Sequence, residues 1–178
     1  VVGHCLQNRR PPAERNELMR RPYKILLSAL VLALLFGRVQ HLRNTAAYGV
    51  ELLLPVEAET VKKIGTLRLL RLRYQPLIPP SAVSESGGRI LVVKGIGSVA
   101  SFAGIYDSKV PLRPQEYVLR YRVAFGASPS VRFGAVWVNI PKGFKAEKAA
   151  FAVLKADKNG NTVLTGLADG NGAVLLRK

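Results

Sequence analysis

The sequence predicts a mainly β fold, an antiparallel β-sandwich or open barrel, preceded by one N-terminal transmembrane helix. Two observations support this prediction. Residues 25–37 form an uncharged apolar run directly behind a basic cluster. Beyond Tyr48 the apolar residues recur with period two, in short segments separated by turn-rich stretches and without alternating helices. We therefore expect one β domain of ordinary size after the apolar run.

The apolar run has the features of a membrane anchor. Met19, the only methionine, is followed by the basic residues Arg20, Arg21 and Lys24 and then by the run itself, the order found in export signals. The nearest small-residue cleavage site, 45–47, lies beyond further basic residues, which disfavour cleavage. We expect an uncleaved anchor over residues 19–43; a cleaved signal and the buried core helix of a soluble protein are the alternatives.

The basic residues around the run predict its orientation. Six lie on the N-terminal side and only Arg38 and Arg43 lie close behind it. The positive-inside rule then places the N-terminus in the cytoplasm and residues 49–178 in the periplasm, with the anchor in a bacterial inner membrane. Residues 1–18 are expected to be either a disordered tail or untranslated sequence upstream of Met19.

The clearest strands are residues 117–123 and 131–139, joined by a turn-rich loop at 126–130. One face of this predicted hairpin collects the expected core residues, which are Tyr117, Leu119, Tyr121, Phe133 and Trp137. The other face carries Val118 and the arginines Arg120, Arg122 and Arg132. Alternation of this kind is typical of half-buried strands.

Further strands follow from the same alternation and from turn signals. The segment 50–54 is expected to end at Pro55, and 66–75 slips by one residue at Leu69-Leu70, which indicates a bulge or a break there. The remaining expected strands are 89–94, 98–105, 151–156, 162–167 and 174–176. Residues 75–88 are expected to form a surface loop, and 141–150 a loop with a helical turn at 146–150.

The residue types restrict the chemistry of the β domain. His4, Cys5 and His41 all precede residue 49, so the domain contains no histidine or cysteine and lacks the usual nucleophile pairs and zinc ligands. We expect no cofactor or metal. Asp107 and Glu116 are the carboxylates considered for the alternative of a carboxylate-based periplasmic hydrolase.

The stretch Asp157-Lys158-Asn159-Gly160-Asn161 has oxygen ligands at alternating positions, like the start of a calcium loop. Its glycine is at position four rather than six, and position twelve is Ala168 rather than glutamate. The Asn-Gly pair therefore favours a hairpin turn.

The formal net charge of +16 favours anionic partners. Arg120, Arg122 and Arg132 are the candidate partner-binding residues, and membrane lipid is the first anionic material that an anchored domain meets. Aromatic residues fall on the opposite face from these arginines, so nucleic acid is an unlikely partner. A soluble basic nucleic-acid-binding protein is the third alternative.

Three stretches resemble the C-terminal half of GDYXXLXY proteins, which are bacterial membrane-anchored proteins of unknown function. These stretches are residues 112–123, 131–134 and 151–169, and the first includes Glu116, Tyr117, Leu119 and Tyr121. The naming motif is matched in part, by Gly65 and Leu70 in one register and by Leu72 and Tyr74 in another. The resemblance implies one anchor, an outward β domain and a multi-pass membrane protein as a neighbour. We expect a non-enzymatic, membrane-anchored envelope protein that binds a partner.

Overall fold

The computed structural model describes residues 12–124 and 130–177, with side-chain surroundings from residue 23 onward. The chain separates into two compact units, Val1–His41 and Leu42–Lys178. Of the predicted N-terminal segment, residues 1–11 lie outside the described part, and residues 12–18 belong to a helix.

The helix α1 spans Pro12–Tyr48 and contains the whole of the expected anchor segment. Its part Tyr23–Tyr48 is long and apolar enough to cross a membrane, as a membrane anchor or a signal sequence would be. Leu26, Leu30 and Leu34 are each more than half exposed, at 68%, 57% and 66%. A helix that is apolar on all sides and uncovered suits a lipid environment, because water would solvate these side chains poorly.

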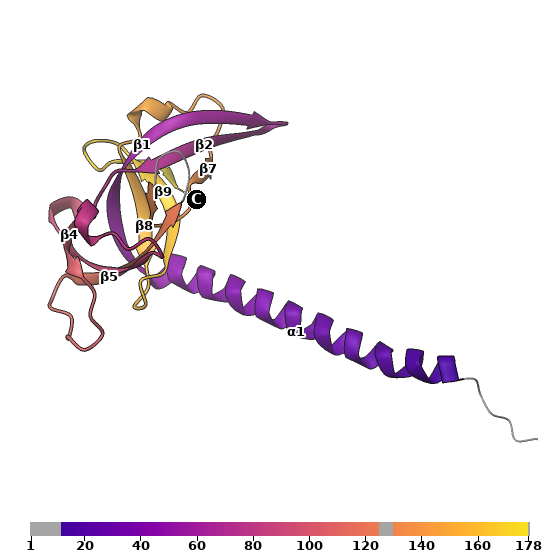
Figure 1. Ribbon diagram of the computed structural model, residues 1–178. Coiled ribbons are helices and arrows are strands. Elements are labelled where there is room, and N and C mark those ends of the chain that lie inside the picture. The colour runs from indigo at the N-terminus through magenta and orange to yellow at the C-terminus, as the bar shows by residue number, and fades with distance from the viewer. Residues whose placement is uncertain (1–11, 125–129, 178) are drawn as a thin grey trace, which may run out of the picture. The chain divides into compact units, whose positions relative to one another are not determined.

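The second unit is built from two curled antiparallel sheets, which confirms the predicted fold class (Figure 1). The strand order of the six-stranded sheet is β10-β9-β8-β1-β2-β7, and that of the four-stranded sheet is β4-β3-β5-β6. The strands are β1 Val50–Ile64, β2 Leu67–Tyr74, β3 Gly88–Lys94, β4 Ala100–Ile105, β5 Glu116–Ala124, β6 Ser130–Arg132, β7 Trp137–Asn139, β8 Phe151–Ala156, β9 Thr162–Ala168 and β10 Val174–Arg177.

Strand β1 does not end at Pro55, so that prediction was wrong. The first half of β1 pairs with β8, up to Pro55 opposite Phe151, and the second half pairs with β2 from Val56 onward. Pro55 stands where β1 exchanges partners, and its carbonyl oxygen accepts the Gln75 N–H at 3.0 Å. A proline is tolerated at such a position because the ladder is interrupted there anyway.

The pairing of β2 is continuous at Leu69-Leu70, so the irregularity predicted there was wrong; the bulge of this hairpin lies in β1. The register between β1 and β2 shifts between Ala58 and Thr60, which leaves Glu59 of β1 without a partner residue. Strand β2 itself alternates regularly from Leu70 to Tyr74, with leucine and tyrosine side chains buried and arginines exposed. The apparent slip arises because Leu69 is half-buried and lies beside β7, opposite Asn139.

The predicted hairpins of β5 with β6 and of β8 with β9 are confirmed, and the predicted strands β3 and β4 form another hairpin. The predicted strand 131–139, however, is two strands in two sheets, since β6 pairs with β5 and β7 pairs with β2. Between them Phe133 is buried, whereas Trp137 is 42% exposed, so Trp137 was wrongly placed in the core. The loop residues 125–129 lie outside the described part.

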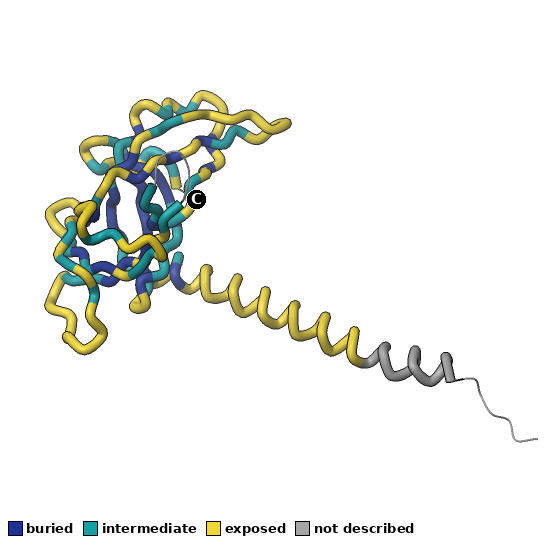
Figure 2. Tube along the Cα trace, viewed as in Figure 1, coloured by how far each residue is buried: buried dark blue, intermediate teal, exposed yellow. Residues whose placement is uncertain are grey.

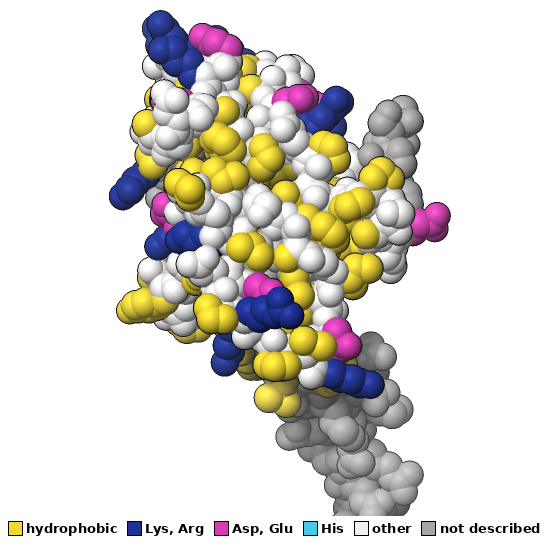
Figure 3. All heavy atoms as spheres, turned by 90° about the vertical axis from the view of Figure 1, so that its left-hand side faces the viewer, with side chains coloured by type: hydrophobic (Ala, Val, Ile, Leu, Met, Phe, Trp, Pro, Cys, Tyr) yellow, Lys and Arg dark blue, Asp and Glu magenta, His cyan; other side chains and the backbone are white. Residues whose placement is uncertain are grey.

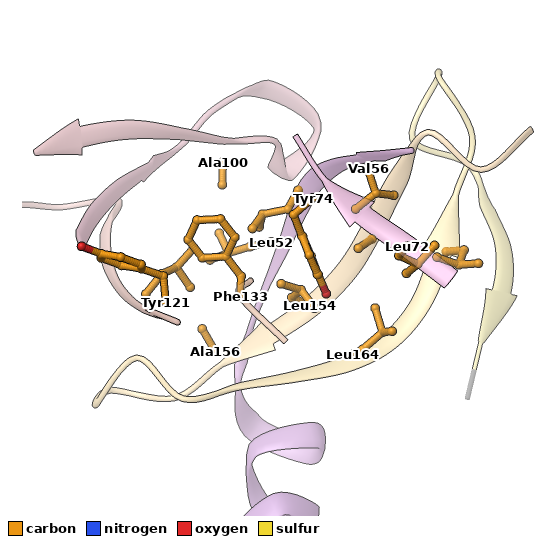
Figure 4. Packing of buried hydrophobic residues seen from close by; sticks show 14 of the residues in the cluster. Leu52, Val56, Leu72, Tyr74, Ala100, Tyr121, Phe133, Leu154, Ala156 and Leu164 are labelled. Carbon is orange, nitrogen blue, oxygen red and sulfur yellow. The ribbon is translucent and has the colours of Figure 1, made fainter. Parts of the chain in front are cut away.

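The main core lies between the two sheets (Figures 2 and 4). Leu119, Tyr121 and Phe133 are buried as expected, and Tyr117 is half-buried against the same cluster. Tyr74 and Phe133, both labelled in Figure 4, have ring centroids 5.9 Å apart and an interplanar angle of 73°. This edge-to-face contact links β2 to the segment that follows β6.

A second, smaller core covers the other face of β1, where Leu53 packs with Val153 and Ala168. Both faces of β1 are therefore covered here, which accounts for the continuous apolar run Leu52-Leu53-Leu54.

Two further expectations about loops were only partly right. In the segment 75–88 the short 3-10 helix Pro80–Ala82 is exposed, but Ile78 is 2% exposed and belongs to the core, so this segment is more than a surface loop. Val118 lies on the same face of β5 as the arginines, but it is buried because the turn before β9 covers it. The Arg120 N–H donates a hydrogen bond to Gly160 O of this turn at 2.8 Å. In the segment 141–150 a single 3-10 turn forms at Ala146–Lys148, close to the expected helical turn.

Candidate anion-binding surfaces

The predicted partner-binding arginines lie on one outer face of the four-stranded sheet. Arg122 of β5 stands directly opposite Arg132 of β6, and Arg120 stands opposite Arg89 of β3. Directly opposite residues share a face, and so do residues two apart on one strand. The three predicted arginines are thus joined by Arg89, and we call these four residues the arginine face.

The arginine face has no internal charge compensation. Arg89, Arg120 and Arg122 are exposed and Arg132 is half-buried, and none of the four forms an ion pair with a carboxylate of the described residues. Like charges directly opposite each other on a sheet repel. An anion placed against this face would relieve that repulsion. Sequence reasoning missed Arg89 because only the pairing register of β3 with β5 brings it there.

A second group of arginines surrounds a carboxylate. Glu59, the bulge residue of β1, contacts two arginines of β2: its Oε1 lies 2.5 Å from Arg73 Nε and its Oε2 lies 3.1 Å from Arg71 Nε. The Arg71 guanidinium also lies over the ring of Trp137, with its Cζ 6.0 Å from the ring centroid. The Glu59 side chain is 19% exposed, whereas those of Arg71 and Arg73 are 47% and 59% exposed.

These residues border a cavity of about 450 Å³, which we call the β2 cleft. The cleft lies between β2 and β6 and is closed by the segment 76–83. Its charged lining consists of Glu59, Arg71, Arg73 and Arg132. Its apolar lining comes mainly from Ile78, Val83, Val123, Val131 and Val136.

Tyr74 forms part of the inner wall of the β2 cleft. Its hydroxyl donates a hydrogen bond to Ala135 O at 2.9 Å. Burial removes water from the phenol oxygen and so raises the Tyr74 pKa well above its ordinary value. Tyr74 therefore stays neutral, and the ionisable charge of the cleft comes from its arginines and Glu59.

A second cavity, of about 640 Å³, lies near the end of the β1–β2 hairpin. Lys63, Arg68 and Lys142 contribute its basic groups and Leu67, Ile140 and Pro141 its apolar ones. Figure 3 shows the side that lies on the left in Figure 1, on which basic side chains stand singly or in pairs among apolar and acidic ones. Positive charge is therefore not concentrated on that side.

The residues that match the family motif mainly support the fold. Gly65 has a φ of +59° at the turn between β1 and β2, a conformation that glycine adopts readily. Leu70, Leu72, Tyr74, Leu119 and Tyr121 are buried in the core. Glu116 Oε2 accepts the Arg113 N–H at 2.8 Å and so closes the turn before β5.

The carboxylates considered for catalysis have local partners. Asp107 Oδ1 accepts the Lys109 N–H at 2.9 Å, and neither Asp107 nor Glu116 lines either of the two cavities. The Asp157 carboxylate closes its own turn, accepting the N–H groups of Asn159 and Asn161 and the Asn161 side-chain amide at 2.8–2.9 Å. Within the described ranges, no three His, Cys, Asp or Glu side chains are grouped to hold a metal ion.

No family model, no curated protein and no solved structure matches this chain. The resemblance to GDYXXLXY proteins therefore stays a prediction.

Proposed function

We propose that this chain is a non-enzymatic, single-pass membrane protein whose β domain binds anionic material of the cell envelope through the arginine face. The observation that supports this most directly is the placement of four guanidinium groups from three adjacent strands on one sheet face without a carboxylate partner among the described residues. Guanidinium groups bind phosphate and carboxylate oxygens well, because their N–H groups form a planar fork.

The helix α1 supports the membrane part of the proposal. A domain attached to a span of this length stays close to a bilayer, so anionic lipid head groups are the nearest material that the arginine face could bind. The excess of basic residues before the span supports a cytoplasmic N-terminus and a β domain on the other side.

The test uses the full chain in nanodiscs of neutral lipid and measures its binding to vesicles with and without phosphatidylglycerol. The variant Arg89→Gln/Arg120→Gln/Arg122→Gln removes three charges from the arginine face. A basic residue near an anionic surface contributes about 1 kcal/mol, so three should lower binding at least tenfold. Arg132 is left intact because it also borders the β2 cleft.

The matched control is Lys62→Gln/Lys63→Gln/Arg68→Gln, which removes the same charge from the far end of the β1–β2 hairpin. We expect it to lower binding much less. Equal losses in both variants would mean that net charge alone attracts the vesicles, and unchanged binding in the arginine-face variant would remove the proposal. Thermal unfolding of each variant shows whether the fold is intact.

A further inference from the structure

We infer that the β2 cleft is a binding site for an amphipathic anion, a molecule with an apolar body and a carboxylate or phosphate head, and that Glu59 occupies the head-group position while the site is empty. This inference rests mainly on Glu59, Arg71 and Arg73, and the β2 cleft shares only Arg132 with the arginine face.

The size and lining of the cleft fit such a molecule. Small-molecule sites usually enclose about 300–1,000 Å³, with mainly apolar walls and a few polar groups that orient the ligand. The β2 cleft measures about 450 Å³ and has an apolar wall of valines and Ile78, with its charged residues from β1, β2 and β6. An apolar body would exclude water from that wall, which favours binding.

The charge of the lining selects an anion. Three arginines and one glutamate border the cleft, which leaves an excess of two positive charges. Glu59 neutralises parts of Arg71 and Arg73 only, through one oxygen atom each. The N–H groups that Glu59 leaves uncovered can bind further oxygens, since each guanidinium carries five N–H donors.

The position of Glu59 explains why its carboxylate can give way. As the bulge residue, Glu59 has no partner residue in β2, so the ladder constrains it less than its neighbours. Its carboxylate bridges the two arginines in the way that a ligand carboxylate or phosphate would. A ligand head that enters the cleft therefore competes with Glu59 for the same N–H groups.

This competition predicts opposite effects for the two partners of one ion pair. In the Glu59→Gln variant the arginines lose their competing charge, so an anion should bind more tightly, by about tenfold. In the Arg71→Gln/Arg73→Gln variant the head group loses two charged donors and should bind at least tenfold more weakly. If the ion pairs of Glu59 were purely structural, the parent chain would not bind the anion, and replacing Glu59 would not increase its affinity for the anion.

The experiment uses the full chain in neutral nanodiscs and octyl phosphate as the probe, with empty nanodiscs to correct for partitioning. Titration calorimetry gives the affinity. Trp137, the only tryptophan, reports on the site through its fluorescence, because Arg71 lies over its ring. Inorganic phosphate, octanol and octyltrimethylammonium each lack one required feature and should bind at least tenfold more weakly than octyl phosphate.

Controls separate this site from the arginine face. Arg89→Gln/Arg120→Gln should leave octyl phosphate binding unchanged, and Arg71→Gln/Arg73→Gln should leave vesicle binding largely unchanged. Arg132→Gln keeps both Glu59 ion pairs and should still weaken the probe, which provides a second test if Glu59→Gln does not fold. No binding of octyl phosphate to the parent chain, or equal binding of octanol, would overturn the inference.

A final arm identifies the source of the anion. If lysophosphatidate placed in the nanodisc displaces octyl phosphate, the ligand is a lipid of the surrounding bilayer. If only soluble octyl phosphate or octanoate occupies the cleft, the ligand is a free organic acid. Both results retain an amphipathic anion as the ligand of the β2 cleft.

Discussion

The rings of Tyr74 and Phe133 meet edge to face, 5.9 Å apart, and tie β2 to the segment after β6. Tyr74 belongs to the six-stranded sheet, and Phe133 to the chain that leaves the four-stranded one. Removing Phe133 should therefore destabilise the whole domain. We expect Phe133→Ala to lower the free energy of unfolding by about 3–5 kcal/mol, because a buried aromatic ring leaves a cavity.

The phenol group of Tyr74 can be tested separately from its ring. Tyr74→Phe keeps the ring contact with Phe133 and removes only the hydrogen bond to Ala135 O, so it should cost about 1–2 kcal/mol. Chemical denaturation in detergent, followed by circular dichroism, measures both variants. A loss for Tyr74→Phe as large as that for Phe133→Ala would show that the ring contact is not what joins the sheets.

Stability should also depend on pH through Tyr74. Burial raises the Tyr74 pKa in the folded chain, whereas the unfolded chain titrates near 10.0. Below pH 10 the phenol is neutral in both states and has no effect. As the pH rises above 10, only the unfolded state loses the proton, so the free energy of unfolding falls by up to about 1.4 kcal/mol per pH unit. Tyr74→Phe should lack this component, and parallel curves for both chains from pH 9 to 11 would contradict the prediction.

The turn between β8 and β9 depends on Gly160. Its φ is +82°, and an added Cβ would lie 3.0 Å from both Arg120 N and Val118 Cγ1. Gly160→Ala should therefore destabilise the domain by about 1–3 kcal/mol. Gly170→Ala is the matched control, since nothing lies within 4 Å of its added Cβ, and it should change stability by less than about 0.5 kcal/mol. Equal melting temperatures for the two variants would contradict this account of the turn.

Membrane attachment should depend on the apolar side chains of α1. Leu30→Arg/Leu34→Arg introduces two charges into the candidate span, at a cost of about 2.5–3.5 kcal/mol each. The variant should move from the membrane pellet to the soluble fraction, whereas Leu112→Arg in the β domain should not. If the anchor is uncleaved, the chain in the membrane pellet keeps its N-terminal segment. If the N-terminus is cytoplasmic, a reporter fused after Lys178 should be active only outside the cytosol.

Strands and turns that depend only on residues adjacent in the sequence were predicted best. Strand β5 shows clear alternation, and the Asp-Lys-Asn-Gly-Asn turn between β8 and β9 carries its own signal, so the hairpins β5–β6 and β8–β9 were confirmed. Pro55 misled the prediction of β1, because a proline interrupts a strand only where the ladder requires an N–H donor, and β1 changes its pairing partner at this position. Trp137 misled the core prediction, because alternation cannot show that a chain changes sheets between β6 and β7.

The charged residues also differ in how far the sequence alone could place them. Arg120, Arg122 and Arg132 could be assigned to one face from alternation alone. Arg89 and Glu59 could not, because their neighbours are set by strand register and by a bulge. Arg71 and Arg73 were visible as exposed strand arginines, but the ion pairs with Glu59 join strands whose bulge and pairing had not been predicted.

The exchange of partners along β1 has a mechanical consequence. Only Gly49 separates the end of α1 from the start of β1, so tension on the helix reaches β1 directly. Six residue pairs join the first half of β1 to β8, with hydrogen bonds perpendicular to the strand. A pull along β1 strains these hydrogen bonds together rather than one after another, so pulling the chain at its helix should require more force than peeling β10 from the edge of the sheet.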